Sequence, residues 1–270
     1  MKSDARFADD ALAGKSLVIV GGTGGLGRAA TRACVAAGAR VVAVGRDPEK
    51  AEALVHEFGA AVRIITGDAG EAGTAESAVA VAVAHFGGLD GLYHVAGGSG
   101  RAHGDGPLHE LTAEGWAYTM QLNLASVFHS NRAAVRQFLA QGRGGSILNC
   151  ASVLGFSPSP RYFTTHAYAA AKAGVIGLTT ASASHYAPQG IRCNVVAPAL
   201  VATAMSQRAQ KDEAILRFIR TKQPLDGGRI GQPEDLDAAV VWLLSDASRF
   251  VTGQVIAIDG GWSVSEGQFA

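Results

Sequence analysis

Short apolar runs alternate along this chain with longer segments in which apolar residues recur at helical spacing. The apolar runs predict strands at residues 16–20, 40–44, 62–66, 89–95, 146–152, 192–196 and 254–258. The segments between them predict helices, of which those at 112–141, 165–187 and 234–244 are the clearest. Strands that alternate with helices throughout predict a single α/β domain built on a doubly wound parallel sheet.

Two segments depart from this alternation. Residues 1–13 are polar and predict a flexible leader, so the domain is expected to span residues 14–270. Residues 199–223 carry apolar side chains in an amphipathic pattern, including Met205, Ile215 and Phe218. We expect this segment to form a mobile flap over a substrate.

The first predicted strand leads directly into a glycine-rich turn and then into an alanine-rich helix. Glycines let the backbone approach a pyrophosphate, and the helix N-terminus offers free N–H groups to it. This context predicts a Rossmann-like dinucleotide site, whereas the glycines alone would indicate only a tight turn. The expected contacts are Gly21, Thr23, Gly25, Leu26 and Gly27.

The end of the second predicted strand bears on the choice of cofactor. An acidic residue there would bind the ribose 2′-hydroxyl of NAD, whereas an arginine suits the 2′-phosphate of NADP. Gly45 ends the strand and Arg46 follows, which favours NADP, with NAD as the alternative. Asp47 fits either a ribose contact or a cap for the helix that begins at Pro48. Asp68, after the third strand, is a candidate for the adenine or equally for a turn or helix cap.

Three polar side chains suggest chemistry. Ser152 ends a predicted strand, and Tyr168 and Lys172 lie four residues apart, hence on one face of the next helix. A lysine ammonium within ~4–6 Å of a phenol lowers its pKa by roughly 1–3 units. Such a group can polarise a carbonyl, or take the proton of an alcohol, while a hydride moves to or from a cofactor. The same spacing also fits an ordinary pair on a helix surface.

Composition and charge argue against several classes of partner and site. The net charge is zero and no basic run occurs, which argues against nucleic acid. The N-terminal residues lack the apolar core of a signal peptide, and no uncharged stretch fits a membrane span. The isolated cysteines fit neither a metal site nor a disulfide framework, which predicts a reducing cytoplasm. His103, His109 and His166 are expected to be surface or structural residues, so no metal is expected.

Together these motifs resemble the short-chain dehydrogenase/reductase family, in its single-domain branch, from Leu12 to about Ser263. The family's glycine motif is matched by Gly21, Gly25 and Gly27. Its catalytic set of asparagine, serine, tyrosine and lysine is matched by Asn123, Ser152, Tyr168 and Lys172. The segments 194–198 and 259–261 also look like family signatures.

The resemblance implies a role for each matched residue. Tyr168 would be the acid/base, Ser152 would hold the substrate oxygen, and Lys172 would bind the nicotinamide ribose and lower the pKa of the tyrosine. Asn123 would anchor a water in a proton relay, although from the sequence alone the favoured interpretation is a satisfied polar residue within a helix. Further cofactor contacts are expected at Ala96, Gly97, Tyr168, Lys172, Pro198 and Thr203.

The chain departs from the family pattern at several points. Val20 stands where a threonine is usual, and the usual Asn-Asn-Ala-Gly reads His94-Val95-Ala96-Gly97, which puts side-chain contacts there in doubt. The usual Pro-Gly reads Pro198-Ala199. Ser152 and Tyr168 are 16 residues apart, a few more than is usual, and we expect the longer loop to shape the substrate pocket.

We therefore expect an NADP(H)-dependent oxidoreductase that acts on a small-molecule carbonyl or secondary alcohol. A nucleotide-sugar-modifying enzyme of the same superfamily remains an alternative, because Gly21, Gly24 and Gly27 satisfy its glycine spacing as well. A non-catalytic dinucleotide sensor is a second alternative, although it would not need to keep Tyr168. By the resemblance, the chain is expected to form a homotetramer or homodimer through the helices at 112–141 and 165–187.

Overall fold

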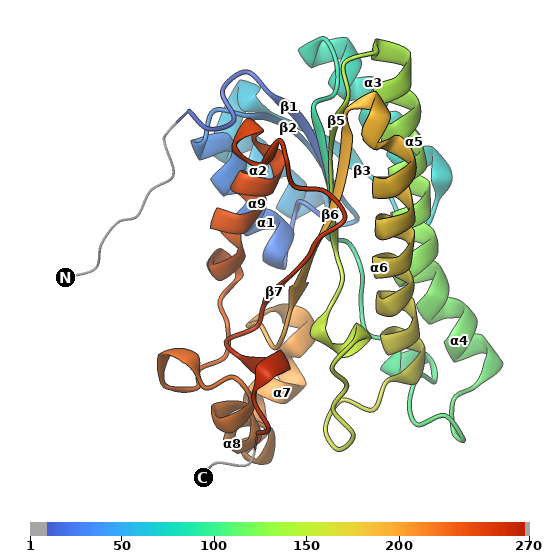
Figure 1. Ribbon diagram of the computed structural model, residues 1–270, viewed down its shortest axis with the longest axis vertical. Helices are drawn as coiled ribbons and strands as arrows, with labels where there is room; N and C mark the ends of the chain where they lie inside the picture. The colour runs from blue at the N-terminus through green and yellow to red at the C-terminus, as the bar shows by residue number, and fades with distance from the viewer. Residues whose placement is uncertain (1–9, 268–270) are drawn as a thin grey trace.

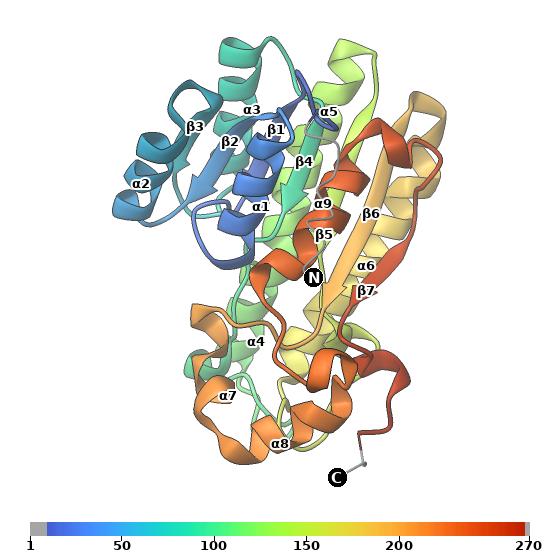
Figure 2. The ribbon, with the colours of Figure 1, turned by 90° about the vertical axis from the view of Figure 1, so that its left-hand side faces the viewer.

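Within residues 10–267, which the computed structural model describes, seven parallel strands form one sheet in the order β3-β2-β1-β4-β5-β6-β7 (Figures 1 and 2). The strands are β1 (Ser16–Val20), β2 (Arg40–Gly45), β3 (Val62–Thr66), β4 (Gly91–His94), β5 (Gly145–Cys150), β6 (Ile191–Pro198) and β7 (Val255–Ile258). The predicted fold class, a doubly wound Rossmann-like sheet in one α/β domain, is confirmed.

Helices cover both faces of the sheet. They are α1 (Gly25–Ala36), α2 (Pro48–Phe58), α3 (Ala72–Phe86), α4 (Ala113–Met120), α5 (Ser126–Gln141), α6 (His166–Tyr186), α7 (Gln207–Lys211), α8 (Glu213–Lys222) and α9 (Asp237–Leu244). Figure 1 shows α1, α2 and α9 on one face and α3, α5 and α6 on the other. None of the helices in the described part of the chain is long and apolar enough to span a bilayer.

The strand residues divide between two apolar cores because successive side chains of a strand point to opposite faces. All five residues of β1 are buried. Leu17 and Ile19 pack in the core beneath α1 and α9, whereas Val18 and Val20 pack in the core beneath α3 and α5. A strand that is apolar on both faces is typical of a parallel sheet with helices on each side.

The strand order reverses direction at β1, which lies between β2 and β4. In doubly wound sheets ligands bind beyond the carboxyl ends of the strands at such a reversal. The glycine turn after β1, the segment after β4 and Ser152 after β5 all lie at this edge. The fold therefore brings the predicted cofactor and catalytic residues to one end of the molecule.

The structure corrects two of the predicted boundaries. Residues 1–9 of the expected leader lie outside the described residues, but residues 10–13 form a turn that packs on the domain. Leu12 is fully buried, and its backbone N–H donates to the carbonyl of Ala37 at 2.8 Å. The single helix predicted at 112–141 is instead α4 and α5, joined by a π-helical turn at Gln121–Ala125. The apolar spacing continues through that turn, so the pattern gave no sign of it.

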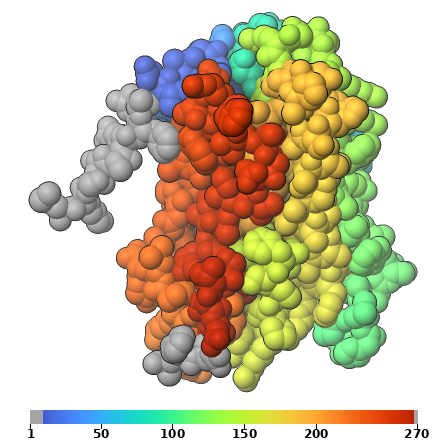
Figure 3. Space-filling model, viewed as in Figure 1, coloured from blue at the N-terminus to red at the C-terminus, as the bar shows by residue number. Residues whose placement is uncertain are grey.

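Residues 199–223, the expected flap, form short helices at the carboxyl end of the sheet. Ile215 and Ile219 of α8 are buried and pack in one cluster with Trp262. In the space-filling view, the α7–α8 segment, the loop after β5 and the C-terminal turn meet in the lower half of the molecule (Figure 3). The expected mobility of this segment stays a prediction.

Candidate active site

A cleft of about 590 Å³ opens at the carboxyl ends of β1, β2 and β4, where the glycine turn lies. Gly21 has a φ of 91°, and a Cβ built there would lie 2.7 Å from the backbone nitrogen of Ala96. A Cβ on Gly27 would lie 2.0 Å from the carbonyl oxygen of Gly21. Glycine at these two positions lets the turn, α1 and the segment after β4 approach one another closely. Gly24 precedes α1 without a side-chain cap, so the first N–H groups of the helix are left for an anionic group.

Most of the predicted cofactor residues line this cleft. They are Gly21, Thr23, Gly25, Leu26, Gly27, Arg46, Asp68, Ala96, Gly97 and Thr203. Tyr168, Lys172 and Pro198 line an adjoining cavity of about 90 Å³, which shares Leu26, Gly97 and Thr203 with the cleft. The structure therefore brings every predicted cofactor residue to two adjoining cavities that share lining residues.

Of the two residues that follow β2, Asp47 caps α2 and Arg46 carries an exposed positive charge. Asp47 Oδ1 accepts a hydrogen bond from the backbone N–H of Lys50, so the predicted capping of α2 is confirmed. The side chain of Arg46 is 70% exposed, and its Nη1 lies 3.8 Å from Asp68 Oδ2. Asp68 also accepts from the backbone N–H of Gly70 at 2.7 Å, which confirms its predicted role as a turn residue. The adenine contact of Asp68 stays a prediction.

The Ser152, Tyr168 and Lys172 side chains converge at the inner end of the cleft. Lys172 on α6 is buried, its Nζ donates to the carbonyl of Cys150 at 2.8 Å, and that Nζ lies 5.6 Å from the ring centre of Tyr168. Ser152 follows β5, and its Oγ accepts from the backbone N–H of Leu154. Ser152 and Tyr168 also line a larger cavity together. The predicted trio therefore assembles as the spacing indicated.

The electrostatics of Tyr168 differ from the expectation. Burial raises the pKa of Tyr168 above its usual range, the nearby Cys150 raises it further, and a hydrogen bond with Ser152 lowers it by less. Burial also lowers the pKa of Lys172, whose ammonium donates a hydrogen bond to the backbone carbonyl of Cys150. The expected net lowering of the tyrosine pKa is therefore wrong for this arrangement, because burial of the phenol raises its pKa by more than its hydrogen bond lowers it.

Asn123 lies in the π-helical turn and is fully buried. Its Oδ1 accepts from the backbone N–H of Gly98 at 3.0 Å, and its Nδ2 donates to the carbonyls of Gly98 and Thr119. A Cβ on Gly97 would lie 2.8 Å from this Oδ1 and 3.5 Å from Lys172 Nζ, so Asn123 sits beside the lysine. The side chain is thus satisfied as expected, and its water-anchoring role stays a prediction.

His94, which departs from the family pattern, is buried at the end of β4. Its Nδ1 lies 2.7 Å from Ser130 Oγ, and its Nε2 lies 3.3 Å from Ser126 Oγ, both on α5. Burial, and next the charge of Lys172, lower the pKa of His94 to about 3. The ring is therefore neutral and joins β4 to α5 rather than contacting the cleft.

The other histidines of interest have structural contacts. His103 stacks on Tyr118 with ring centres 3.7 Å apart, and His166 Nδ1 lies 3.0 Å from the carbonyl oxygen of Gly106. His109 is exposed and lies 3.4 Å from Glu110. Within residues 10–267 we find no cluster of three or more His, Cys, Asp or Glu that could hold a metal ion.

Two features of the site were missed from the sequence. Asp105 is buried, and its two carboxylate oxygens accept from the backbone N–H groups of Ala167 and Tyr168, each at 3.0 Å. It thereby fixes the first turn of α6, which carries Tyr168, and it also suits the positive end of the helix dipole. The signal was one acidic residue in the glycine-rich loop 97–106. The second feature is a pair of arginines, Arg101 and Arg208, that line a cavity beside Ser152 and Tyr168.

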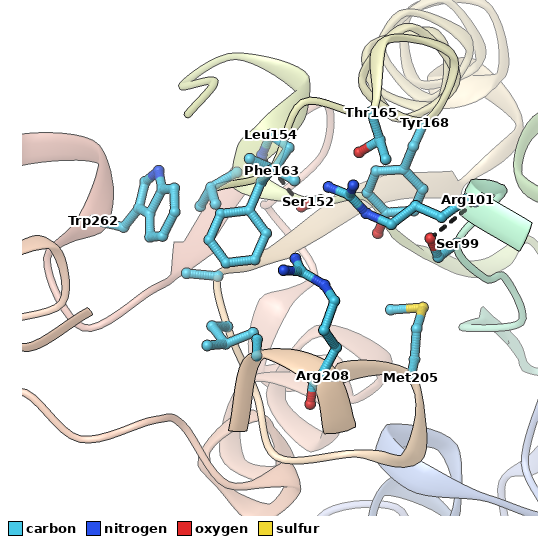
Figure 4. A pocket seen from close by; sticks show the side chains of 15 residues that line it. Ser99, Arg101, Ser152, Leu154, Phe163, Thr165, Tyr168, Met205, Arg208 and Trp262 are labelled. Atoms are coloured by element: carbon cyan, nitrogen blue, oxygen red, sulfur yellow. Dashed lines mark hydrogen bonds between the residues drawn. The ribbon is translucent and has the colours of Figure 1, made fainter. Parts of the chain in front are cut away.

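That cavity, of about 210 Å³, opens beside Ser152 and Tyr168 (Figure 4). Its apolar wall comes from Val153, Leu154, Phe163, Leu200, Met205 and Trp262. The segment 199–209 and the loop after β5 both line this cavity, and their predicted contact with a substrate stays a prediction. Phe156 of that loop is instead 46% exposed.

Comparisons with known proteins show which family the chain resembles. The family model described as "Enoyl-(Acyl carrier protein) reductase" matches residues 21–263. A curated 2,5-dichloro-2,5-cyclohexadiene-1,4-diol dehydrogenase from Sphingobium indicum is 35% identical over 253 residues, which cover 93% of this chain and 98% of that relative.

Solved structures agree as well. A short-chain type dehydrogenase/reductase from Mycobacterium ulcerans superposes with a TM-score of 0.86 at 31% identity, covering 94% of this chain and 91% of the other. A gluconate 5-dehydrogenase from Burkholderia cenocepacia, solved with NADP and tartrate, superposes with a TM-score of 0.84 at 31% identity, covering 94% and 97%. The chain therefore belongs to the short-chain dehydrogenase/reductase family, whose members are NAD(P)-dependent oxidoreductases of alcohols and carbonyl compounds.

Proposed function

We propose that this enzyme transfers a hydride between NADP(H) and a carbonyl or secondary alcohol held against Ser152 and Tyr168. The observation that carries the proposal is that the nucleotide side of the site and the proposed substrate cavity both reach Tyr168. The nucleotide cleft shares lining residues with the cavity of Tyr168 and Lys172, and the proposed substrate cavity is lined by Tyr168 as well. A hydride donor and a carbonyl can therefore meet at the phenol.

Each catalytic residue has a separate task in the proposed reaction. In reduction, the Tyr168 hydroxyl gives its proton to the carbonyl oxygen, and in oxidation the phenolate takes a proton from the alcohol. Ser152 donates a hydrogen bond to the same oxygen. Lys172 Nζ, fixed by the Cys150 carbonyl, binds the nicotinamide ribose, and Asn123 anchors a water beside it. When bound, the nicotinamide supplies or accepts the hydride.

Cofactor choice rests on the residues at the end of β2. An acid at Gly45 would collide with Thr23, because a Cβ there would lie 1.9 Å from Thr23 Oγ1. Arg46 is exposed at the cleft, where its guanidinium suits a 2′-phosphate. The NADP complex of the related gluconate 5-dehydrogenase supports the same choice. NAD remains the alternative cofactor, because the Asp47 carboxylate is placed where it could bind a ribose hydroxyl.

Replacement of Tyr168 by phenylalanine tests the acid/base role. The Tyr168→Phe variant keeps the ring but has no proton to transfer, so we expect turnover to fall roughly 100- to 10,000-fold. The dissociation constant for NADPH should stay within about threefold of the wild-type value, whereas Tyr118→Phe, on the exposed face of α4, should keep its turnover. Near-normal turnover in Tyr168→Phe would overturn the assignment. Cofactor binding by the wild type without turnover of any carbonyl or alcohol in a broad panel would favour the sensor.

We also propose a homotetramer or homodimer in the cytoplasm. Trp116, Phe128 and Leu139 on α4 and α5 are each more than 40% exposed, which is unusual for a face that meets only water. Cys34, Cys150 and Cys193 are free and buried, as is common where thiols stay reduced.

A further inference from the structure

Two arginines enter the substrate cavity from different parts of the chain. Arg101 comes from the segment after β4, and Arg208 comes from α7. Figure 4 shows both guanidinium groups in the space between Phe163 and Tyr168. Neither residue lines the nucleotide cleft, so the two charges belong to the substrate side of the site.

The hydrogen-bonding capacity of this pair is mostly unused. Arg101 Nη2 and Arg208 Nη2 donate to the same acceptor, the backbone carbonyl of Tyr162, at 3.4 and 3.1 Å. A guanidinium carries five N–H donors, so most of the donors of this pair have no hydrogen-bond partner in the described part of the protein. Within residues 10–267, neither arginine forms an ion pair, and no Asp or Glu lines the cavity. Asp105, the acidic residue nearest in this loop, uses both oxygens on the backbone of α6.

The two cations also act on each other. Burial lowers the pKa of Arg101, Arg208 lowers it further, and Asp105 opposes this less strongly. An anion between the guanidiniums would relieve their repulsion and occupy their free donors. A carboxylate suits this arrangement because its two oxygens accept parallel N–H bonds from a guanidinium fork.

We propose that Arg101 and Arg208 bind a carboxylate of the substrate, so that the enzyme acts on hydroxy acids and oxo acids. The proposal rests on the proposed function and names its substrate class. The carboxylate of the substrate would lie at the arginines while its reacting carbon lies at Ser152 and Tyr168. The part of the substrate between these two groups would contact Phe163 and Trp262. The arginines are specificity-determining residues in this arrangement, and the proton transfer remains with Tyr168.

Matched substrate pairs test the proposal. In oxidation the pairs are gluconate with sorbitol and 3-hydroxybutyrate with 1,3-butanediol, and in reduction the pair is levulinate with methyl levulinate. Rates are followed by NADPH absorbance at one ionic strength, because exposed charges are screened by salt. We expect kcat/KM to favour the acid at least tenfold in each pair that is turned over. Equal values for acid and neutral partner would overturn the proposal and leave the proposed function intact.

Charge removal identifies the residues. In Arg101→Met and Arg208→Met the acid-to-neutral ratio of kcat/KM should fall roughly 10- to 100-fold, mainly through KM of the acid, since a charge-assisted hydrogen bond is lost. Arg208→Lys keeps the charge but not the forked donors, so its acid-to-neutral ratio should lie between those of the wild type and Arg208→Met. Arg161→Met removes an exposed charge beside Tyr162 that lines no part of the cavity, and it should keep the wild-type ratio. A ratio that is unchanged in both Met variants, or equally reduced in Arg161→Met, would overturn the assignment.

A binding measurement separates this proposal from the proposed function. The dissociation constants of levulinate and methyl levulinate are measured by calorimetry on the NADP-saturated Tyr168→Phe protein, where no turnover interferes. Tighter binding of levulinate that disappears with Arg208→Met supports the carboxylate site even where every pair fails as a substrate, and such failure would count against the proposed function alone. Equal binding of the two compounds, or tighter binding of inorganic phosphate than of levulinate at that site, would overturn the carboxylate assignment.

Discussion

Gly45 leaves room for the side chain of Thr23, and this single contact bears on cofactor recognition. The position at the end of β2 is where an acid would bind the ribose of NAD. Here a side chain would displace Thr23, which is buried. Asp47 is engaged as the cap of α2, which leaves Arg46 to meet the group on the ribose.

We expect Arg46→Ala to weaken NADPH binding roughly 10- to 100-fold while NADH binding changes less than twofold. The guanidinium forms a charge-assisted pair with the 2′-phosphate that NADH lacks. Dissociation constants for both cofactors at one salt concentration measure the effect. Arg63→Ala, which removes a guanidinium bonded to the backbone of residues 60 and 62, is the control. Equal loss of both cofactors in Arg46→Ala would show that Arg46 does not read the phosphate.

Asp105 offers a second test at this scale. Asp105→Ala removes both acceptors that hold the first turn of α6, and we expect kcat with a neutral substrate to fall roughly tenfold or more, because a small displacement of Tyr168 is costly. Asp105→Asn keeps one acceptor oxygen, so its kcat should lie between those of the wild type and Asp105→Ala. Glu110→Ala on the exposed neighbouring turn is the control. Unchanged kcat in Asp105→Ala would mean that the carboxylate is not needed to position the tyrosine.

The contrast between Tyr168 and Asp105 shows what a sequence reveals about a site. Tyr168 and Lys172 could be paired in advance because helical geometry places residues four apart on one face. Asp105 lies 63 residues before Tyr168, and only the folding of the loop after β4 brings its carboxylate to α6. Arg101 and Arg208 are hidden for the same reason, since they meet at a carbonyl that neither is near in sequence.

At the scale of elements, β4 and α5 are joined by the buried ring of His94. The segment from α4 to α5 was predicted as one helix, and the π-helical turn within it places Asn123 against Gly98. Periodicity could not reveal that turn because one extra residue in a turn hardly alters the apolar spacing. The strands themselves were predicted closely, since each is short, apolar and bounded by polar or glycine residues.

His94 makes the stability of this contact depend on pH. Its pKa is about 3 in the folded protein and near ~6.5 when unfolded, so the unfolded chain binds the extra proton between these values. Stability from this residue is therefore present above about pH 6.5 and is lost as the pH falls, by at most about 1.4 kcal/mol per pH unit. His94→Asn should remove that slope. Urea unfolding of both proteins at pH 7.5, 6.5 and 5.5 measures it, and parallel slopes would contradict the assignment.

At the scale of the whole molecule, the sheet places its chemistry at one edge and leaves apolar side chains exposed along α4 and α5. The alternation of strands and helices was enough to predict the first of these, because a parallel sheet has all its carboxyl ends together. It was not enough to show which helix residues face outward, since Phe128 and Leu139 look like core residues in the sequence.

These exposed residues make the oligomeric state the last prediction. We expect light scattering on the purified protein to give the mass of two or four chains. Burial of the exposed Trp116, Phe128 and Leu139 side chains beneath a second copy lowers the free energy of the assembly. The double variant Phe128→Glu with Leu139→Glu should shift the protein toward smaller assemblies, because it would bury uncompensated charge at the contact. Val55→Glu, which alters a side chain 42% exposed on α2, should leave the mass unchanged. A monomeric wild type at micromolar concentration would contradict the prediction, and so would an unchanged mass in the double variant.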